Sequence, residues 1–191
     1  MRSLNRFAAA VAAIDAANVA DPTSVTVRGA VRPLALVHGE LAAEWVAVLA
    51  PDVDPLVLLA ARAHHLRRWE LPRSQYAAGK AGYLKWKRDQ RQRHARDVGE
   101  LLAEVGYTAK EIEQVQAMVL RQGSGGQLVE DAACLVFIET QLAAVATQLD
   151  HDHLIEVIRK TAKKMSPAAL AAVALIPLGE AEQSLLAAAL A

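Results

Sequence analysis

Apolar residues recur along the chain with the spacing of amphipathic helices. Phe7, Val11 and Ile14 stand at positions i, i+4 and i+7, so they form one apolar stripe on a helix. Residues 55–67 are apolar almost throughout until a histidine pair, and a helix that is apolar on all sides lies buried in the fold. We therefore predict helices over residues 3–18, 33–49, 55–67, 81–105, 108–121, 128–149, 151–164, 167–175 and 180–190.

Polar and helix-breaking residues mark the ends of these helices. Asp54 precedes a proline, as an N-cap residue does when proline occupies the first helical position. Thr108 and Glu111 have the spacing of a capping box. Residues 122–126, which read Gln-Gly-Ser-Gly-Gly, predict the most flexible loop of the chain. Residues 25–32 predict an irregular or weakly extended link, and we expect no strand pair.

The composition agrees with a helical fold. Hydrophobic residues make up 53% of the 191 residues, and alanine and leucine dominate while β-branched runs are few. We predict a single all-α domain over residues 1–191 with about eight or nine helices. An N-terminal helix within residues 1–20 and Ala- and Leu-rich helices in residues 166–191 are expected to pack on this domain.

The cysteine content and the length of the apolar runs indicate a cytoplasmic protein. Cys134 is the single cysteine, which excludes an internal disulfide and fits a reducing compartment. No apolar run approaches the roughly 18 to 20 residues needed to span a bilayer. We therefore expect no membrane partner.

Charge is balanced over the chain but not along it. There are 21 basic and 21 acidic residues, so general attraction to nucleic acid is not indicated. Between Arg62 and Arg96, however, 11 Lys and Arg residues stand against two acids, Glu70 and Asp89. An anionic partner is expected to meet the protein on this basic 62–96 surface.

Several side chains able to bind a metal lie on separate predicted helices, each beside apolar sequence, so we expect them to be partly buried. These candidate ligands are His38, His64, His65, His94 and Asp131. Adjacent residues on a helix point about 100° apart, so His64 and His65 cannot be buried in the same way. Imidazole nitrogens with a carboxylate suit one divalent ion such as Mn, Fe, Ni, Co or Zn. Such an ion lowers the pKa of a bound water to about 7.

Each of these candidates also has a purely structural explanation. A buried histidine that is hydrogen-bonded to a backbone carbonyl is the commoner arrangement for any one position. Asp131 also fits a first-turn carboxylate, which favours the positive end of a helix. Only the order and spacing of the whole set favour a metal site.

Basic residues follow the histidine pair closely and suit the recognition of phosphate. The candidates are Arg68, Arg73, Lys80 and Arg88. Guanidinium groups bind phosphate through two parallel hydrogen bonds. Interleaved aromatic residues are able to stack on a base or sugar, although Tyr83 and Trp86 share one helix face and fit packing equally well. The charges also fit a solvated helix face.

The order of these residues resembles the HD-domain superfamily, which comprises all-helical metal-dependent phosphohydrolases with a His, His-Asp, Asp signature. By this resemblance His38 is the first His, His64 is the His of the doublet, and Asp131 is the last carboxylate. His94 resembles the additional His of some members. Longer segments, among them HHLRRW, GYLKW and EDAACLVF, are similar to an uncharacterised bacterial domain-of-unknown-function family, over about residues 15–177. Its members are sometimes labelled as related to glutamyl-tRNA synthetase, but no synthetase nucleotide-binding motif occurs here.

The chain departs from the superfamily pattern at specific positions. His65 replaces the Asp of the doublet and offers one nitrogen lone pair, so it cannot bridge two metals. Arg121 stands where some members carry a further His and repels a second cation, so the resemblance implies one metal ion. Asp131 lies four residues before Leu135 rather than two, which makes Glu130 the fallback ligand or the general base for the attacking water.

We expect from these observations a divalent-metal-dependent phosphohydrolase that acts on a nucleotide or another small phosphorylated compound. His38, His64 and Asp131 would bind the metal, and His65 or His94 would complete or orient the sphere. The basic residues after the histidine pair would neutralise the phosphate and its transition state.

Two other kinds of function remain open. A non-catalytic helical module is able to bind RNA or a phosphorylated ligand through the basic 62–96 surface, and His65 in place of Asp fits a degenerate metal site. A helical scaffold that forms a homodimer through its Ala- and Leu-rich C-terminus is a third possibility.

Overall fold

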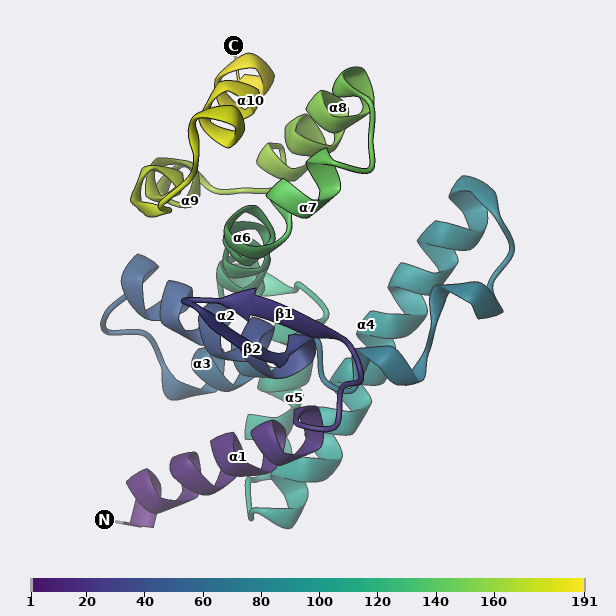
Figure 1. Cartoon of the computed structure of the whole chain (residues 1–191). Helices are drawn as coiled ribbons and strands as arrows, with labels where there is room; N and C mark the ends of the chain where they lie inside the picture. Colours follow the sequence, from purple (N-terminus) through teal and green to yellow (C-terminus); the bar gives the residue numbers. More distant parts are fainter. Residues whose placement is uncertain (1, 191) are drawn as a thin grey trace.

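The structure of the protein, a computed structural model, describes residues 2–190 and is mostly helical (Figure 1). Met1 and Ala191, the predicted domain limits, lie outside the described residues. The α-helices are α1 (Arg2–Asn18), α2 (Leu34–Leu49), α3 (Pro55–Arg62), α4 (Gly79–Glu104), α5 (Ala109–Val119), α6 (Gly123–Thr140), α7 (Leu142–Ala146), α8 (His151–Ala162), α9 (Pro167–Ala172) and α10 (Glu180–Leu190). Short 3-10 turns are η1 (Arg68–Glu70), η2 (Arg73–Gln75) and η3 (Val173–Leu175). The prediction of an all-α chain is therefore confirmed in its broad form.

A short β-hairpin follows α1, so the expectation of no strand pair is wrong. Strand β1 (Ser24–Val27) pairs antiparallel with β2 (Ala30–Pro33). Arg28 and Gly29 connect them with positive φ angles of 51° and 78°. Two-residue hairpin turns of this kind match the twist of the strands, but they usually begin with Asn, Asp or Gly. The arginine at the first position concealed the turn.

Helices α3 and α6 differ most from their predicted bounds. Helix α3 ends at Arg62 and not at residue 67, because the chain turns and Arg67 adopts a left-handed φ of 49°. Helix α6 begins at Gly123, so residues 122–126 are not a flexible loop. It ends at Thr140 and α7 follows separately, so the predicted continuous helix over residues 128–149 is also wrong. A Cβ atom on Gly126 would lie 2.5 Å from the carbonyl carbon of Arg121, so a side chain there has no space. Glycine in this segment permits close packing rather than flexibility.

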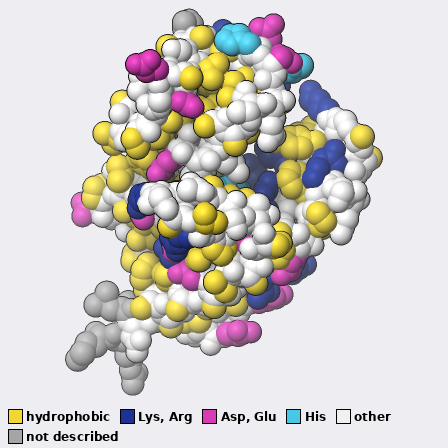
Figure 2. Space-filling model, viewed as in Figure 1, with side chains coloured by type: hydrophobic (Ala, Val, Ile, Leu, Met, Phe, Trp, Pro, Cys, Tyr) yellow, Lys and Arg dark blue, Asp and Glu magenta, His cyan; other side chains and the backbone are white. Residues whose placement is uncertain are grey.

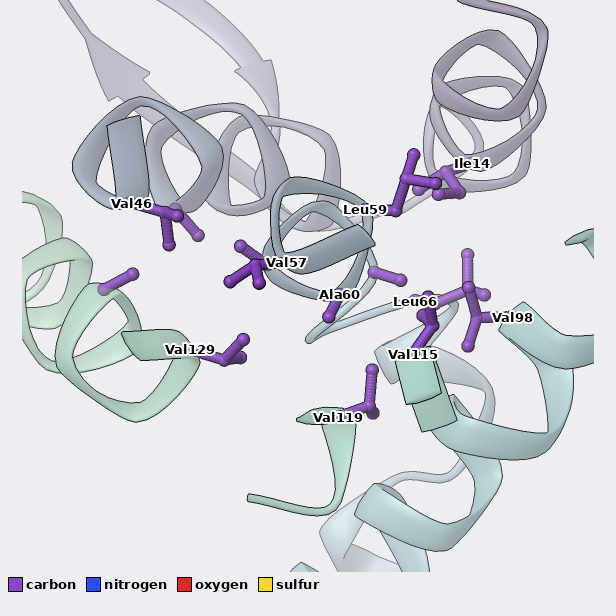
Figure 3. Close-up of a cluster of buried hydrophobic side chains, with 14 of the residues drawn as sticks. Ile14, Val46, Val57, Leu59, Ala60, Leu66, Val98, Val115, Val119 and Val129 are labelled. Atoms are coloured by element: carbon purple, nitrogen blue, oxygen red, sulfur yellow. The ribbon is translucent and has the colours of Figure 1, made fainter. Parts of the chain in front are cut away.

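The larger hydrophobic core surrounds α3. Leu59 and Ala60 of this helix are both 0% exposed. Figure 3 shows that Val57 and Ala60 point toward side chains of the helices around α3. Ile14 of α1, Val46 of α2, Val98 of α4, Val115 and Val119 of α5, and Val129 of α6 pack in the same core. The predicted burial of this apolar helix is confirmed.

A second core joins the later part of α6 to the C-terminal helices. Leu135 and Leu142 are 0% exposed and pack with residues of α8, α9 and α10. Trp45 of α2 packs against both cores, and its indole nitrogen donates to the Glu139 carboxylate at 2.8 Å. Helices α2 and α6 therefore connect the two cores. Among the described residues, no helix has the length and apolar character that crossing a membrane requires.

Candidate functional site

Four histidines that are distant in sequence lie together where α2, the turn after α3, and α4 meet. His38 comes from α2, His64 and His65 from the turn, and His94 from α4. The ring centroids of His64 and His65 are 4.0 Å apart, and those of His38 and His65 are 5.4 Å apart. The His65 and His94 centroids are separated by 6.2 Å. We call these four side chains the histidine cluster.

The turn after α3 places both neighbouring histidines in this cluster. Asn18, a buried residue at the end of α1, accepts a hydrogen bond from the backbone N–H of Arg67 at 2.9 Å. This bond supports the left-handed backbone at Arg67, a conformation that costs a non-glycine residue about 1–2 kcal/mol. Because His64 and His65 follow the end of α3, their directions are not set by helical spacing.

The proton positions of two histidines follow from their backbone partners. His64 Nδ1 lies 2.7 Å from the Ala61 carbonyl oxygen, and His94 Nδ1 lies 2.7 Å from the Leu66 carbonyl oxygen. A carbonyl oxygen only accepts, so each Nδ1 carries the hydrogen. Burial, followed by the Arg121 charge, puts the pKa of His64 well below its usual value, and burial and Arg68 lower the pKa of His94 to about 3. Both rings are therefore neutral, and each has its lone pair on Nε2.

The proton positions of the other two histidines follow from a chain of hydrogen bonds. Thr140 Oγ1 donates to the Val136 carbonyl at 2.7 Å, so it accepts from His38 Nε2 at 3.2 Å. Burial and then the Arg68 charge lower the pKa of His38 to about 4, so this ring is neutral and its Nδ1 has the lone pair. His65 Nδ1 lies 3.1 Å from that nitrogen and donates to it. The remaining lone pair of neutral His65 is consequently on Nε2.

The donor chemistry of this cluster fits a transition metal, but the described side chains do not form a complete ligand set. Metal-binding histidines characteristically donate one ring N–H to a carbonyl or carboxylate and present the other nitrogen to the ion. Among the described residues, Nε2 of His64 and Nε2 of His94 are buried and have no hydrogen-bond partner. No group of three His, Cys, Asp or Glu side chains in residues 2–190 is arranged to hold a metal ion. Binding would therefore require a third ring, such as that of His65, to reorient.

The two predicted carboxylates have other partners. Asp131 is 1% exposed, and its Oδ1 accepts from the Ser166 backbone N–H at 2.8 Å and from Gln127 at 2.9 Å. These bonds join α6 to the start of α9, which is a structural role for Asp131. We therefore do not count Asp131 among the proposed metal ligands.

Glu130 is engaged by cations. Its carboxylate lies 2.6 Å from Arg121 Nε, 3.1 Å from Arg91 and 4.0 Å from Lys164. Burial opposes ionisation, but the attraction of these cations outweighs it, so the pKa of Glu130 lies below its usual value. A carboxylate stabilised in its charged form is a weak proton acceptor, so we do not carry Glu130 forward as a general base.

The four predicted phosphate-binding residues differ in their surroundings. Arg73 donates to the backbone carbonyls of Tyr76 at 2.9 Å and Ala77 at 2.7 Å, so it closes the loop before α4. Lys80 and Arg88 are exposed on α4, and the Arg88 Nε atom lies 3.5 Å from an oxygen of Asp89. Their position leaves these residues on the outer surface.

Arg68 is the candidate that faces the histidine cluster. It is half-buried, its guanidinium lies 4.7 Å from the centroid of the Trp86 ring, and burial lowers its pKa. Within the described residues Arg68 forms no ion pair. It lines a cavity of about 70 Å³ together with His38, His65, Gln141 and one carboxylate, that of Asp21. At about 10–15 Å³ for each water-sized group, this cavity has room for several such groups.

Hydrogen bonds to the backbone fix the position of Arg68. Gln90 Nε2 donates to the carbonyls of Arg68 at 2.8 Å and Leu71 at 2.9 Å. Trp86 Nε1 also donates to the Leu71 carbonyl at 2.9 Å, which gives this tryptophan a packing role. The Gln90 amide oxygen, like the two imidazole nitrogens, is buried without a partner among the described residues. Neither Asn18 nor Gln90 was singled out from the sequence, because their contacts depend on the tertiary fold.

A basic hollow is visible between the projecting end of α4 and the C-terminal helices (Figure 2). Lys87 of α4 is half-buried, and burial together with the charges of Lys164, Arg91 and Arg68 lowers its pKa. We call the surface formed by Lys87, Lys164, Arg91 and Arg68 the basic cleft. The sequence analysis did not select Lys87, although its i, i+4, i+7 spacing with Arg91 and His94 indicates one helix face.

Comparison with known proteins gives one result and corrects one expectation. A family model described as a domain of unknown function (DUF4202) matches residues 8–186. No curated protein and no solved structure matches the chain. The expected membership of the HD-domain superfamily is wrong, because the family that matches is a domain of unknown function with no shown link to that superfamily. The family model covers nearly the whole chain, and the protein therefore belongs to the DUF4202 family.

Proposed function

We propose that the protein is a divalent-metal-dependent phosphohydrolase that acts on a small phosphorylated compound. The observation that carries this proposal is the pair of buried, partnerless nitrogens, His64 Nε2 and His94 Nε2, beside the half-buried cation Arg68. Leaving a buried polar atom without a partner costs about 1–3 kcal/mol, so two such atoms in one cluster favour a ligand that satisfies both.

The proposed ligands differ from those expected from the sequence. His64 and His94 supply two nitrogens, and His65 or His38 supplies the third, since all four rings lie in one cluster. A divalent ion held there would supply a bound water whose pKa is lowered to about 7, which is a nucleophile at neutral pH.

The charges around the cluster suit an anionic substrate. Arg68 is close enough to the histidines to lower the pKa of His38 and of His94. The ion and Arg68 together would outweigh Asp21, the carboxylate that lines the cavity with them, and Glu130 is already engaged by Arg121 and Arg91. A phosphate bound between them neutralises this excess, and Arg68 stabilises the charge that develops during hydrolysis.

The test combines elemental analysis with an activity screen. Protein purified without chelators is expected to contain close to one equivalent of Mn, Fe, Ni, Co or Zn, and to hydrolyse at least one compound in a panel of phosphate esters and nucleotides. His94→Asn should lose the metal, and Arg68→Met should retain the metal but lose most activity. His153→Asn, at an exposed position on α8, is the matched control. Absence of bound metal together with absence of any stabilisation by added metal refutes the proposal.

A non-catalytic module that binds RNA or a phosphorylated ligand is the second candidate. It is favoured by the lack of a converging group of three metal ligands within residues 2–190, and by the occupation of Glu130 and Asp131 elsewhere. Under this alternative, binding of phosphate or an oligonucleotide survives His64→Asn, is lost in Arg68→Met, and weakens as salt increases.

A further inference from the structure

We infer that the basic cleft contains a second anion-binding subsite, and that the ligand carries at least two adjacent phosphoryl groups. Lys87, Arg91 and Lys164 form this second subsite, while Arg68 and the histidine cluster form the first. This inference rests on the proposed function for the placement of the first phosphoryl group. It adds the substrate class, an organic or inorganic polyphosphate.

Cations outnumber carboxylates around Lys87. Lys87 forms no ion pair in the part of the chain that the structure describes, and the charges closest to it include Lys164, Arg91 and Arg68. Glu130 is the acid that opposes them, but Arg121 already binds it at 2.6 Å and Arg91 at 3.1 Å. Lys164 lies 4.0 Å from the same carboxylate, so three cations share one negative charge, while Lys87 and Arg68 form no ion pair among the described residues.

Part of this excess positive charge is withdrawn from solvent. Lys87 and Arg91 are both half-buried, and they stand four residues apart on α4, where like charges destabilise a helix. Burial also lowers the pKa of Lys87, which shows that the protein environment opposes its charge. Charged groups that serve only solubility remain fully hydrated, whereas these ammonium and guanidinium groups are partly withdrawn from water. A bound polyanion relieves both the repulsion and the loss of solvation.

The two subsites are aligned along one face of α4. Lys87, Arg91 and His94 follow one face of α4 at i, i+4 and i+7, so Lys87 lies about 10 Å along the helix axis from His94. The Arg68 charge acts on both of these groups, because it contributes to lowering the pKa of Lys87 and the pKa of His94. A lysine side chain is long, so a short polyphosphate spans the distance from the histidine cluster to Lys87. Figure 2 shows dark blue Lys and Arg side chains along the hollow in this region.

The paired acidic residues make the rest of the basic 62–96 surface a poorer site. Lys85 binds Asp89 at 2.5 Å, and Arg96 binds Asp97 at 2.7 Å. Arg93 is also paired, with Glu70 and Asp97. The unpaired charge on the partly buried side of α4 is thus concentrated at Lys87, near Lys164, whereas Lys80, which also forms no ion pair among the described residues, is exposed. This concentration favours a compact polyanion over a nucleic acid strand, which needs cations along an extended path.

Isothermal titration calorimetry with inorganic ions tests the subsite without reference to activity. Orthophosphate, pyrophosphate and tripolyphosphate are titrated into the full-length protein as purified, at about 150 mM salt, which screens long-range attraction. We expect pyrophosphate and tripolyphosphate to bind at least about tenfold more tightly than orthophosphate, because a second charged contact is added. Lys87→Met should reduce this preference to less than about threefold, and Lys87→Arg should restore most of it.

Lys85→Met is the matched control, because Lys85 lies on the same helix two residues earlier and is already paired with Asp89. This variant should keep the full preference for polyphosphate. Equal binding of orthophosphate and tripolyphosphate by the unmodified protein overturns the inference, and so does an unchanged preference in Lys87→Met. Tighter binding of a short single-stranded RNA than of tripolyphosphate overturns it in favour of the RNA-binding alternative.

The two proposals fail in distinguishable ways. A protein that contains metal and binds orthophosphate through Arg68, but shows no preference for polyphosphate, retains the proposed function and loses the second subsite. A protein without metal that prefers tripolyphosphate in a Lys87-dependent manner retains the second subsite and loses the proposed hydrolase.

Discussion

Addition of a divalent metal is expected to raise the melting temperature of the protein through His64 and His94. In metal-free protein their Nε2 atoms are buried without a partner among the described residues. A metal ion that binds only the folded state, at a free concentration of about 100 times its Kd, stabilises that state by about 2.7 kcal/mol. For a chain of 191 residues, each kcal/mol shifts the melting temperature by about 2–4 °C. The expected increase is therefore about 5–11 °C.

The variant His94→Asn separates metal binding from folding. The asparagine amide nitrogen takes the place of Nδ1 and is able to donate to the Leu66 carbonyl, which His94 now contacts at 2.7 Å. Asparagine has no atom in the place of Nε2, so the metal-dependent increase should disappear. The smaller side chain leaves a void, which should lower the stability of the metal-free variant by roughly 1–2 kcal/mol.

Differential scanning fluorimetry with Mn, Fe, Ni, Co and Zn measures both effects after treatment with a chelator. His153→Asn is the control, since the His153 side chain is 71% exposed and pairs with Asp150 on the surface. This control should show the full increase. The reasoning about the histidine cluster is refuted if none of the five metals raises the melting temperature, or if His94→Asn responds as strongly as the unmodified protein.

Three further predictions concern packing, a carboxylate and pH. Gly39→Ala should lower the free energy of unfolding by about 1–3 kcal/mol in urea titrations, because its Cβ would lie 2.4 Å from the Arg62 carbonyl oxygen; unchanged stability contradicts this close contact. Asp131→Ala should lower the free energy of unfolding by about 1.5–3 kcal/mol, because its hydrogen bond to the Ser166 N–H is lost. The variant should keep the metal-dependent increase in melting temperature, and loss of that increase would show that Asp131 is a ligand. The free energy of unfolding of metal-free protein should fall as pH decreases from about 6.5 toward 3, because the unfolded chain takes up a proton that buried His94, with a pKa of about 3, does not. Urea titrations across this range give the dependence of that free energy on pH, which should be weaker by up to about 1.4 kcal/mol per pH unit in His94→Asn. An equal pH dependence in the variant contradicts the assignment.

Helical periodicity predicted most of the fold because the buried faces repeat in sequence. The apolar run of α3 and the capping box of Thr108 and Glu111 are local signals, and both occur as predicted. The early end of α3 depends on Asn18, which is 49 residues before Arg67, so no local pattern contains it. The glycines at the start of α6 indicated flexibility because their close neighbours are visible only in the folded chain.

The candidate site was predictable only as far as local sequence signals reach. Residue type and apolar neighbours selected the four histidines, and the structure brings them together. Sequence could not show that Ser166 and Arg121 already engage Asp131 and Glu130, because those contacts are made across the fold or between successive helices. Lys87 was missed since a count of charges does not distinguish a lysine in a cleft from one that is paired, as Lys85 is.

The projecting end of α4 has a consequence for motion in the protein. From Gly79 to Asp89, within the described chain, Gly82 is the residue that is buried, so this part of the helix has little hydrophobic packing to resist local opening. Its backbone amides should therefore exchange with deuterium by brief separation from the body of the protein rather than by global unfolding. A ligand that spans Lys87 and Arg68 would join this segment to the body. Slower exchange of these amides would then report occupancy of the cleft from the part of α4 that lies outside both cores.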